Sequence, residues 1–208
     1  MKNLFSTEGK IYYGMTKIYQ LVILNIIFLV LCVPIITMGA AITALYGTTF
    51  KMIKDEEKNV SQTFFIIFKK EFQSGTKIWL IYLGLLALFI FSYSFLRTLF
   101  SQNIIFFYFF MLLISLGILT TIYVFPVLSI FDNRIMNTFK NSFFLAIKHA
   151  PQSILLFLIA LFLLVIVPIY FEKLFFLWLT VGYSLTVYIS AHIFRFIFEK
   201  YIIIDEEV

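Results

Sequence analysis

The sequence predicts an all-α, polytopic helical membrane protein, and its composition and the spacing of its apolar runs carry this prediction. Of the 208 residues, 62% are hydrophobic and 13% are charged, and the mean hydropathy is +1.01. A soluble domain has about 25% charged residues, so this chain could not cover its surface with polar groups. We therefore expect a single integral membrane domain over residues 1–208.

Four apolar runs are long enough to cross the roughly 30 Å hydrocarbon core, which takes about 20 helical residues. These runs lie at 78–96, 104–125, 153–171 and 174–198. A shorter run at 18–33 is followed, after Pro34, by another at 35–50. The sequence thus predicts five membrane segments, or six if 35–50 is one of them.

The distribution of positive charge predicts the topology. Basic residues are concentrated in the N-terminal segment, in 51–77, where there are six lysines, and in 126–152. Such segments favour the cytoplasmic side of a membrane. We therefore expect a protein of the cytoplasmic membrane with both termini in the cytoplasm. The formal net charge of +5 then reflects topology rather than nucleic-acid binding.

The N-terminal segment and 51–77 share a side in this topology, so the chain must turn back between them and form a short helical hairpin. Pro34 ends the first arm, because proline lacks a donor and clashes with the preceding turn. Each arm reaches only about 25 Å. Two arrangements fit this length: two crossings of a thinned bilayer, or a re-entrant hairpin.

Small residues repeat every four positions along the return arm, at Gly39, Thr43 and Gly47. This spacing makes a flat helix face that lets another helix approach closely. Alternatively, the face borders a solute path. If it is a packing face, it should accept Ala or Ser but not Leu.

Two amphipathic helices are expected at the cytoplasmic interface, over 61–75 and 133–149. Both segments show apolar residues at helical spacing and carry positive charge. The basic residues singled out are Lys69, Lys70, Lys140 and Lys148. They are candidates for docking a cytoplasmic partner or anionic lipid; alternatively, the helices only anchor two loops. Shifted by 75 residues, the segments show a weak similarity of the kind that a parallel internal repeat would produce.

Few polar residues lie inside the runs. Asn25 is central in the first run, where an amide must find a hydrogen bond, either as a cross-link between helices or as a ligand contact. Ser184 and Tyr188 belong to a polar stripe on the last run. That stripe faces either another helix or a solute pathway.

The chain shows no constellation for catalysis. Carboxylates are absent from the runs, which argues against ion-coupled transport. His149 and His192 have no metal-binding or catalytic partners near them in the sequence. We therefore expect no enzymatic activity, no metal and no cofactor.

The run LNIIFLVLCVPIITMGAAITALY at 24–46 resembles the YesL-like family of bacterial membrane proteins, a family of unknown function. The resemblance rests on Asn25, Pro34, Thr37-Met38-Gly39 and Thr43-Ala44-Leu45-Tyr46. Ile26 and Ile27 stand where family members have Leu and Trp. Later Phe- and Lys-rich segments extend the likeness over most of the chain. Family members are often encoded beside carbohydrate importers, which implies a role in uptake or its sensing.

Two function classes follow. In the first, the protein is a non-enzymatic accessory or regulatory subunit of a sugar-uptake transporter or sensor complex; the basic helices and the small-residue hairpin favour it. In the second, it is itself a small-solute transporter, as the polar stripe and the internal similarity suggest. The sequence specifies neither a substrate nor an oligomeric state.

The topology can be tested with cysteines introduced singly at positions 58, 103 and 140 and probed on intact cells with a membrane-impermeant thiol reagent. Position 103 should be labelled, because it lies in the lysine-poor connection, whereas 58 and 140 should not. Labelling of position 58 from outside would overturn the hairpin.

Overall fold

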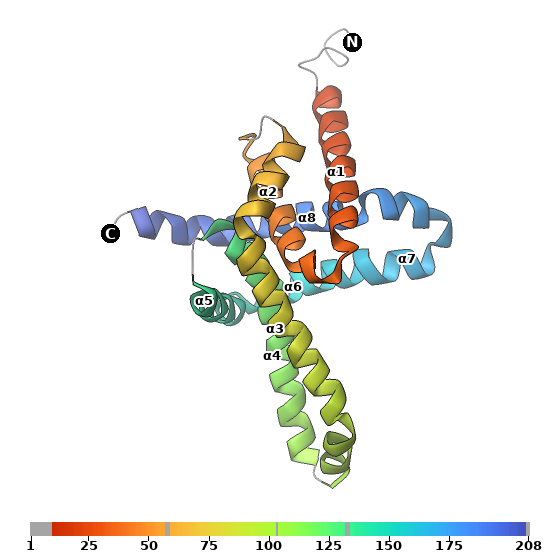
Figure 1. The fold of residues 1–208 in the computed structure, drawn as a ribbon, viewed down its shortest axis with the longest axis vertical. Coiled ribbons are helices and arrows are strands. Elements are labelled where there is room, and N and C mark those ends of the chain that lie inside the picture. The colour runs from red at the N-terminus through yellow and green to blue at the C-terminus, as the bar shows by residue number, and fades with distance from the viewer. Residues whose placement is uncertain (1–9, 57–58, 103, 132–133, 207–208) are drawn as a thin grey trace.

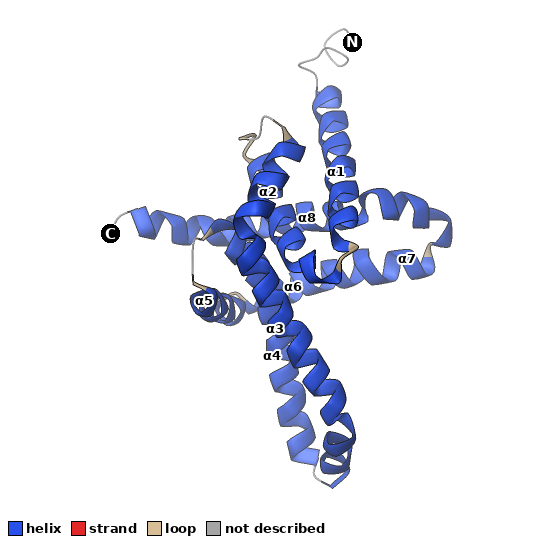
Figure 2. Ribbon diagram, viewed as in Figure 1, coloured by secondary structure: helices blue, strands red, loops and turns tan. Residues whose placement is uncertain are grey.

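The computed structural model describes residues 10–56, 59–102, 104–131 and 134–206 (Figure 1), and positions 58 and 103 lie outside them. Within these residues every regular element is a helix (Figure 2). Five of the helices are long and apolar enough to cross a membrane. The predicted all-α, polytopic membrane fold is therefore confirmed.

The N-terminal hairpin consists of α1 (Lys10–Cys32), the short 3-10 turn η1 (Ile35–Thr37) and α2 (Met38–Ile53). Pro34 stands at the bend, as predicted, with an extended backbone. The Thr37 hydroxyl lies 2.5 Å from the Leu31 carbonyl and 2.8 Å from that of Pro34. It therefore satisfies a carbonyl group that the end of α1 would leave unpaired.

Helix α2 lies at the centre of the molecule, and most of its residues are buried. Its 16 residues correspond to a length of about 24 Å, and α2 is not one of the five long apolar helices. The bend before it is apolar and exposed: Val33 is 80% and Ile35 62% accessible. Such a bend suits a hydrocarbon environment, which favours the re-entrant arrangement.

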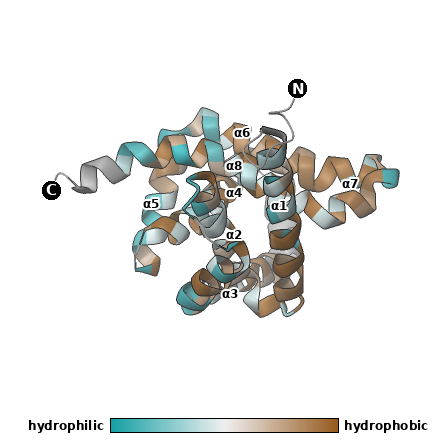
Figure 3. Cartoon of the chain, turned by 90° about the horizontal axis from the view of Figure 1, so that it is seen from above, coloured by the Kyte–Doolittle hydropathy of each residue, from teal (hydrophilic) through white to brown (hydrophobic). Residues whose placement is uncertain are grey.

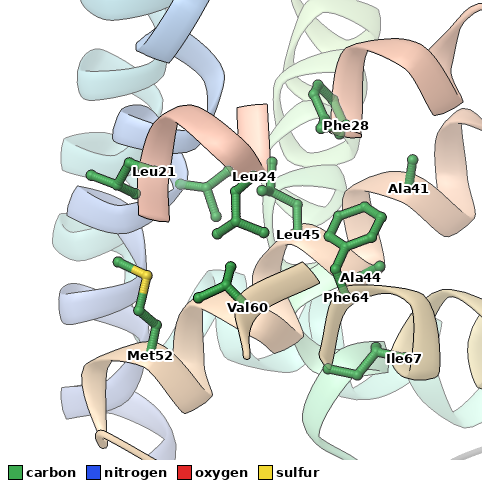
Figure 4. Close-up of a cluster of buried hydrophobic side chains, with 11 residues drawn as sticks. Leu21, Leu24, Phe28, Ala41, Ala44, Leu45, Met52, Val60, Phe64 and Ile67 are labelled. Atoms are coloured by element: carbon green, nitrogen blue, oxygen red, sulfur yellow. The ribbon is translucent and has the colours of Figure 1, made fainter. Parts of the chain in front are cut away.

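The next hairpin pairs α3 (Val60–Gln102) with α4 (Ile104–Ile130). We expected an interfacial helix at 61–75 separate from a span at 78–96, and this division is wrong, because α3 is one continuous helix of 43 residues. Its first turns are built into the protein: Phe64 and Ile67 are buried in the cluster shared with α1 and α2 (Figure 4). Lys69, Lys70 and Lys77 of this segment are exposed on the same helix, whereas Glu71 is buried.

Helix α4 continues past Pro126, where the sequence predicted its end at residue 125. Pro126 is buried, and the Ser129 hydroxyl donates a hydrogen bond of 2.8 Å to its carbonyl. Pro126 has no amide hydrogen, so the carbonyl that loses its usual helical partner is that of Ile122, one turn earlier, and the Ser129 bond does not replace that partner; membrane helices nevertheless tolerate proline.

The separate amphipathic helix predicted at 133–149 is present as α5 (Ile135–Lys148). The chain bends at His149 and enters α6 (Ala150–Leu161). Pro151 stands in the first turn of α6, where it cannot donate the hydrogen bond that would continue a helix from α5. The two segments of the 75-residue similarity therefore differ in structure, since α3 runs unbroken through the corresponding position.

The last hairpin runs from α6 through the π-helical turn η2 (Phe162–Ile166), α7 (Val167–Tyr170) and η3 (Glu172–Leu174) to α8 (Phe175–Glu206). The Trp178 indole donates a hydrogen bond of 2.7 Å to the Leu163 carbonyl in the π-helical turn. Gly182 leaves the space for that indole, because a Cβ there would lie 2.7 Å from Trp178 Nε1. This contact ties the two arms of the hairpin together.

The two long hairpins diverge from a common centre. In Figure 1, α3–α4 extends downward and α6–α8 extends to the right, while the ends of the described chain lie at the top and the left. Figure 3 shows hydrophobic residues along the α6–α8 hairpin and hydrophilic residues gathered toward the C-terminal part of α8. We call the α3–α4 and α6–α8 hairpins the two arms of the molecule, and the region around the C-terminal part of α8 its polar end.

Close backbone contact between α2 and α3 holds the centre together. A Cβ added at Gly39 would overlap the Gly75 carbonyl oxygen and lie 2.6 Å from Trp79 Cβ. A Cβ at Gly75 would lie 2.8 Å from Ala40 Cα. The structure thus contradicts the expectation that position 39 would accept Ala, because a methyl group there meets backbone rather than a mobile side chain.

We predict that Gly75→Ala lowers the free energy of unfolding by about 1–3 kcal/mol, the usual effect of overpacking. Gly84→Ala is the matched control on the same helix, because no heavy atom lies within 4 Å of a Cβ there. Unfolding in mild detergent, followed by helical circular dichroism, would compare them. Equal stability of the two variants would show that the α2–α3 crossing can relax.

Candidate functional site

Asn25 joins α1 to α8 through the main chain of α8. Its side chain is fully buried. Its Nδ2 donates a hydrogen bond of 2.8 Å to the Leu179 carbonyl, and its Oδ1 accepts one of 2.9 Å from the Ser184 amide. The carboxamide therefore uses both its donor and its acceptor within the protein. Of the two roles considered for Asn25, a cross-link between helices and a ligand contact, these bonds are those of a cross-link.

Ser184 and Tyr188 both contact neighbouring groups of the protein in this structure. The Ser184 hydroxyl is buried and donates toward the Leu21 carbonyl of α1, at 2.8 Å. Tyr188 is half-buried, packs against the α1–α2–α3 cluster and contacts the His192 ring edge-on. Further along α8, Arg195 pairs with Glu199 at 2.6 Å.

The small residues of α2 pack against neighbouring helices. Thr43 is buried and its hydroxyl donates a hydrogen bond of 2.9 Å to the Gly39 carbonyl of the same helix. A Cβ at Gly47 would lie 3.1 Å from Ile67 Cδ1 of α3. Together with Gly39 against Gly75, these contacts make the predicted small-residue face the contact surface for α3.

A cavity of about 500 Å³ lies among the membrane helices. Its wall is mainly apolar, and the described residues that line it include no Asp, Glu, Lys or Arg. The wall draws on α1, α2, α3, α4, α6, η2 and α8, with the residues Phe28, Leu29, Cys32, Met38, Ile42, Leu45, Tyr46, Trp79, Thr121, Ile122, Phe125, Leu156, Ala160, Leu164, Tyr183, Thr186, Val187 and Ser190.

Three hydroxyl residues of α8 line this cavity: Tyr183, Thr186 and Ser190. They lie on a different face of the helix from Ser184 and Tyr188, the pair singled out from the sequence. Tyr46 and Trp79 line the cavity too. Sequence reasoning missed all five, although the i, i+3, i+7 spacing on α8 was a signal that could have found the first three.

The polar end of the molecule is organised around a buried lysine. Lys17 of α1 donates hydrogen bonds to the Met52 carbonyl at 2.6 Å and to Asp55 at 2.7 Å. Asp55 follows α2 with a positive φ of 52°, a left-handed conformation that Asp tolerates better than most residues. The hydrogen bond from Lys17 lowers the pKa of the Asp55 carboxyl below its ordinary value. An ion pair thus marks the level at which both arms of the hairpin leave the apolar region.

The four lysines proposed for docking are exposed and belong to two helices, α3 for Lys69 and Lys70 and α5 for Lys140 and Lys148. Lys70 lies 3.6 Å from Glu71. The Lys148 ammonium stands 5.4 Å from the Phe144 ring centroid and 5.0 Å from that of Tyr201. Exposed phenylalanines accompany both pairs, with Phe65 and Phe72 on α3 and Phe143 and Phe144 on α5.

Beside Lys70, a second cavity of about 280 Å³ opens at the polar end between α2, α3, α4 and α8. Charges of both signs line it, from Lys51, Lys54, Lys70 and Arg195 and from Glu56, Glu71 and Glu199. Its mixed lining distinguishes it from the apolar cavity.

The two histidines lie apart from any metal-binding group. Across the described ranges, no set of three or more His, Cys, Asp and Glu side chains could hold a metal ion. His149 Nε2 lies 3.1 Å from the Tyr201 hydroxyl. Partial burial, with the charges of Lys148 and Lys200, lowers the pKa of His149, so its neutral form is favoured and it can bond Tyr201 at the bend between α5 and α6.

Comparison with known families covers the part of the chain that holds the α2–α3 crossing. Residues 21–93 match the family described as Protein of unknown function, DUF624. The YesL-like family carries this domain, so the family resemblance is confirmed. The matched residues include Asn25, Pro34, Gly39 and Gly75. No curated protein and no solved structure matches the chain.

We predict that Asn25→Leu lowers the free energy of unfolding by about 1–3 kcal/mol, because the buried Ser184 amide and Leu179 carbonyl lose their partner. Ile26→Leu, at a neighbouring position that is 51% exposed, is the control and should be neutral. Equilibrium unfolding in mixed detergent micelles would measure both variants. A stable Asn25→Leu protein would show that α8 can close its own hydrogen bonds without the carboxamide.

Proposed function

We propose that the protein is a non-enzymatic accessory or regulatory subunit of a bacterial membrane complex for carbohydrate uptake or sensing. This proposal rests on the different positions of two sets of polar side chains, one buried between helices and the other exposed. Inside the membrane region, Asn25 and Ser184 are used in helix–helix hydrogen bonds. The lysines proposed for docking are exposed on α3 and α5.

The basic helices suit contact with another protein. Each of α3 and α5 presents exposed lysines beside exposed phenylalanines, and aromatic groups next to cations are frequent in binding surfaces. In the proposed topology both helices begin on the cytoplasmic side of the membrane, together with the N- and C-termini. The carbohydrate connection rests on the resemblance to the YesL-like family.

The alternative, a small-solute transporter, has weaker support. A sugar needs many hydrogen-bonding groups along its path, because a buried hydroxyl without a partner is costly. The cavity between the membrane helices has a mainly apolar wall. No carboxylate of the described residues lines it, and an ion-coupled carrier would use such a group.

The proposal can be tested by affinity purification of the full chain from its native cells in mild detergent, with quantitative mass spectrometry of the proteins that copurify. Components of a carbohydrate uptake or sensing complex should be enriched with the parent protein. They should be reduced at least tenfold in the double variants Lys69→Gln/Lys70→Gln and Lys140→Gln/Lys148→Gln. These side chains are exposed, so both variants should insert and fold.

Lys173→Gln is the control, because Lys173 is exposed in η3 at the tip of the last hairpin. It should leave copurification unchanged. Vesicles that contain only the purified protein supply the opposing test. If these vesicles accumulate labelled sugars, the protein is itself a transporter and the proposal of an accessory subunit is wrong.

A further inference from the structure

The apolar cavity between the diverging hairpins must hold something other than water. A water molecule in a cavity needs two to four polar partners, and a cavity lined by apolar side chains stays dry. The hydroxyls of Thr121 and Thr186 already donate to carbonyls of their own helices, at 2.9 and 2.8 Å. Most of the remaining wall is aliphatic or aromatic carbon.

An empty space of this size is also unfavourable. Atoms that line a void lose their dispersion contacts on that side, and protein interiors are packed with few voids larger than a water molecule. A volume of about 500 Å³ is instead typical of a site that encloses a small organic molecule, with apolar walls and a few hydrogen-bonding groups.

The position of the cavity determines which molecule can reach it. It is walled by Thr121 and Ile122 of α4 on one hairpin and by Ala160 of α6 and Leu164 of η2 on the other. Each side continues into an exposed apolar surface: Ile118 on α4 is 46% and Leu161 on α6 is 38% accessible. The two hairpins diverge from the centre of the molecule (Figure 1), and the cavity lies between apolar residues of both.

We propose that this cavity binds an acyl chain of a membrane phospholipid, which enters from the bilayer between the α3–α4 and α6–α8 hairpins. The chain fills the apolar space against Phe28, Trp79 and Leu164. The hydroxyls of Tyr46 and Ser190 also line the cavity and are hydrogen-bonded to each other, which leaves one hydroxyl hydrogen of the pair for an ester group. This site is independent of the proposed docking of a partner by the basic helices.

The two tryptophans of the chain make the site measurable. Trp79 lines the cavity, whereas Trp178 does not, so Trp178→Phe leaves one reporter. The full-length Trp178→Phe protein is reconstituted into vesicles of phosphatidylcholine with brominated acyl chains, which quench indole fluorescence on contact. Trp79 emission should fall relative to unbrominated vesicles. Ala160→Phe, which fills the cavity, should at least halve that loss.

Leu158→Phe is the matched control. It adds an aromatic ring on the same helix at a position that is 51% exposed and outside the cavity, so quenching should stay at the parent level. If Trp79 is quenched equally in the Trp178→Phe protein with and without Ala160→Phe, the proposal is wrong, because Trp79 would then be in contact with bulk lipid. Leu164→Phe replaces Ala160→Phe if the latter does not fold.

A second measurement does not depend on any variant. Native mass spectrometry of the parent protein, washed in detergent, should show a bound phospholipid. If the parent protein appears only at its bare mass and Trp79 of the Trp178→Phe protein is not quenched, the protein has no acyl-chain site.

Discussion

The close approach of α2 and α3 at Gly39 and Gly75 is the contact on which the rest of the structure depends. Only residues without a side chain allow the two backbones to meet there. This contact seats α2, a helix too short to be counted among the spans, in the middle of longer ones. Lipid gives no hydrophobic driving force between helices, so close packing of small residues is a main source of their association.

Around this centre, hydrogen bonds between main chain and side chain fix the outer helices. The Asn25 carboxamide bonds two backbone groups of α8, the Ser184 hydroxyl returns a bond to α1, and the Trp178 indole bonds the π-helical turn. Each of these pairs lies where water cannot substitute for a lost partner. These three side chains, of Asn25, Ser184 and Trp178, are therefore used in contacts between helical elements.

The divergence of the two long hairpins gives the protein two environments. At one end, Asp55 and the Arg195–Glu199 pair are exposed charged groups, and the buried Lys17 pairs with Asp55. Between the α3–α4 and α6–α8 hairpins, which diverge from the centre of the molecule, lies an apolar cavity. Our two proposals, a partner at the exposed lysines of α3 and α5 and an acyl chain in the cavity, follow from this separation of charged and apolar regions.

The sequence by itself determined the class of the protein, the positions of four long apolar runs, the bend at Pro34 and the separate helix α5, because hydropathy, proline and helical spacing are local properties. It also indicated the small-residue face of α2. The sequence did not reveal that residues 61–75 continue directly into the following span, because lysines on an exposed side look the same in a surface helix and in the first turns of a long one.

Only the tertiary structure decided what each polar or small residue faces. At Gly75 there is no room for a side chain, because α2 crosses α3 at that point. Ser184 links two helices, because α1 lies against α8 there and accepts its hydrogen bond. The wall of the cavity likewise comes from seven helical elements, so the cavity cannot be predicted from any single segment of the sequence. Such sites arise from the packing of distant segments, whereas the pattern along one helix shows only which residues share a face.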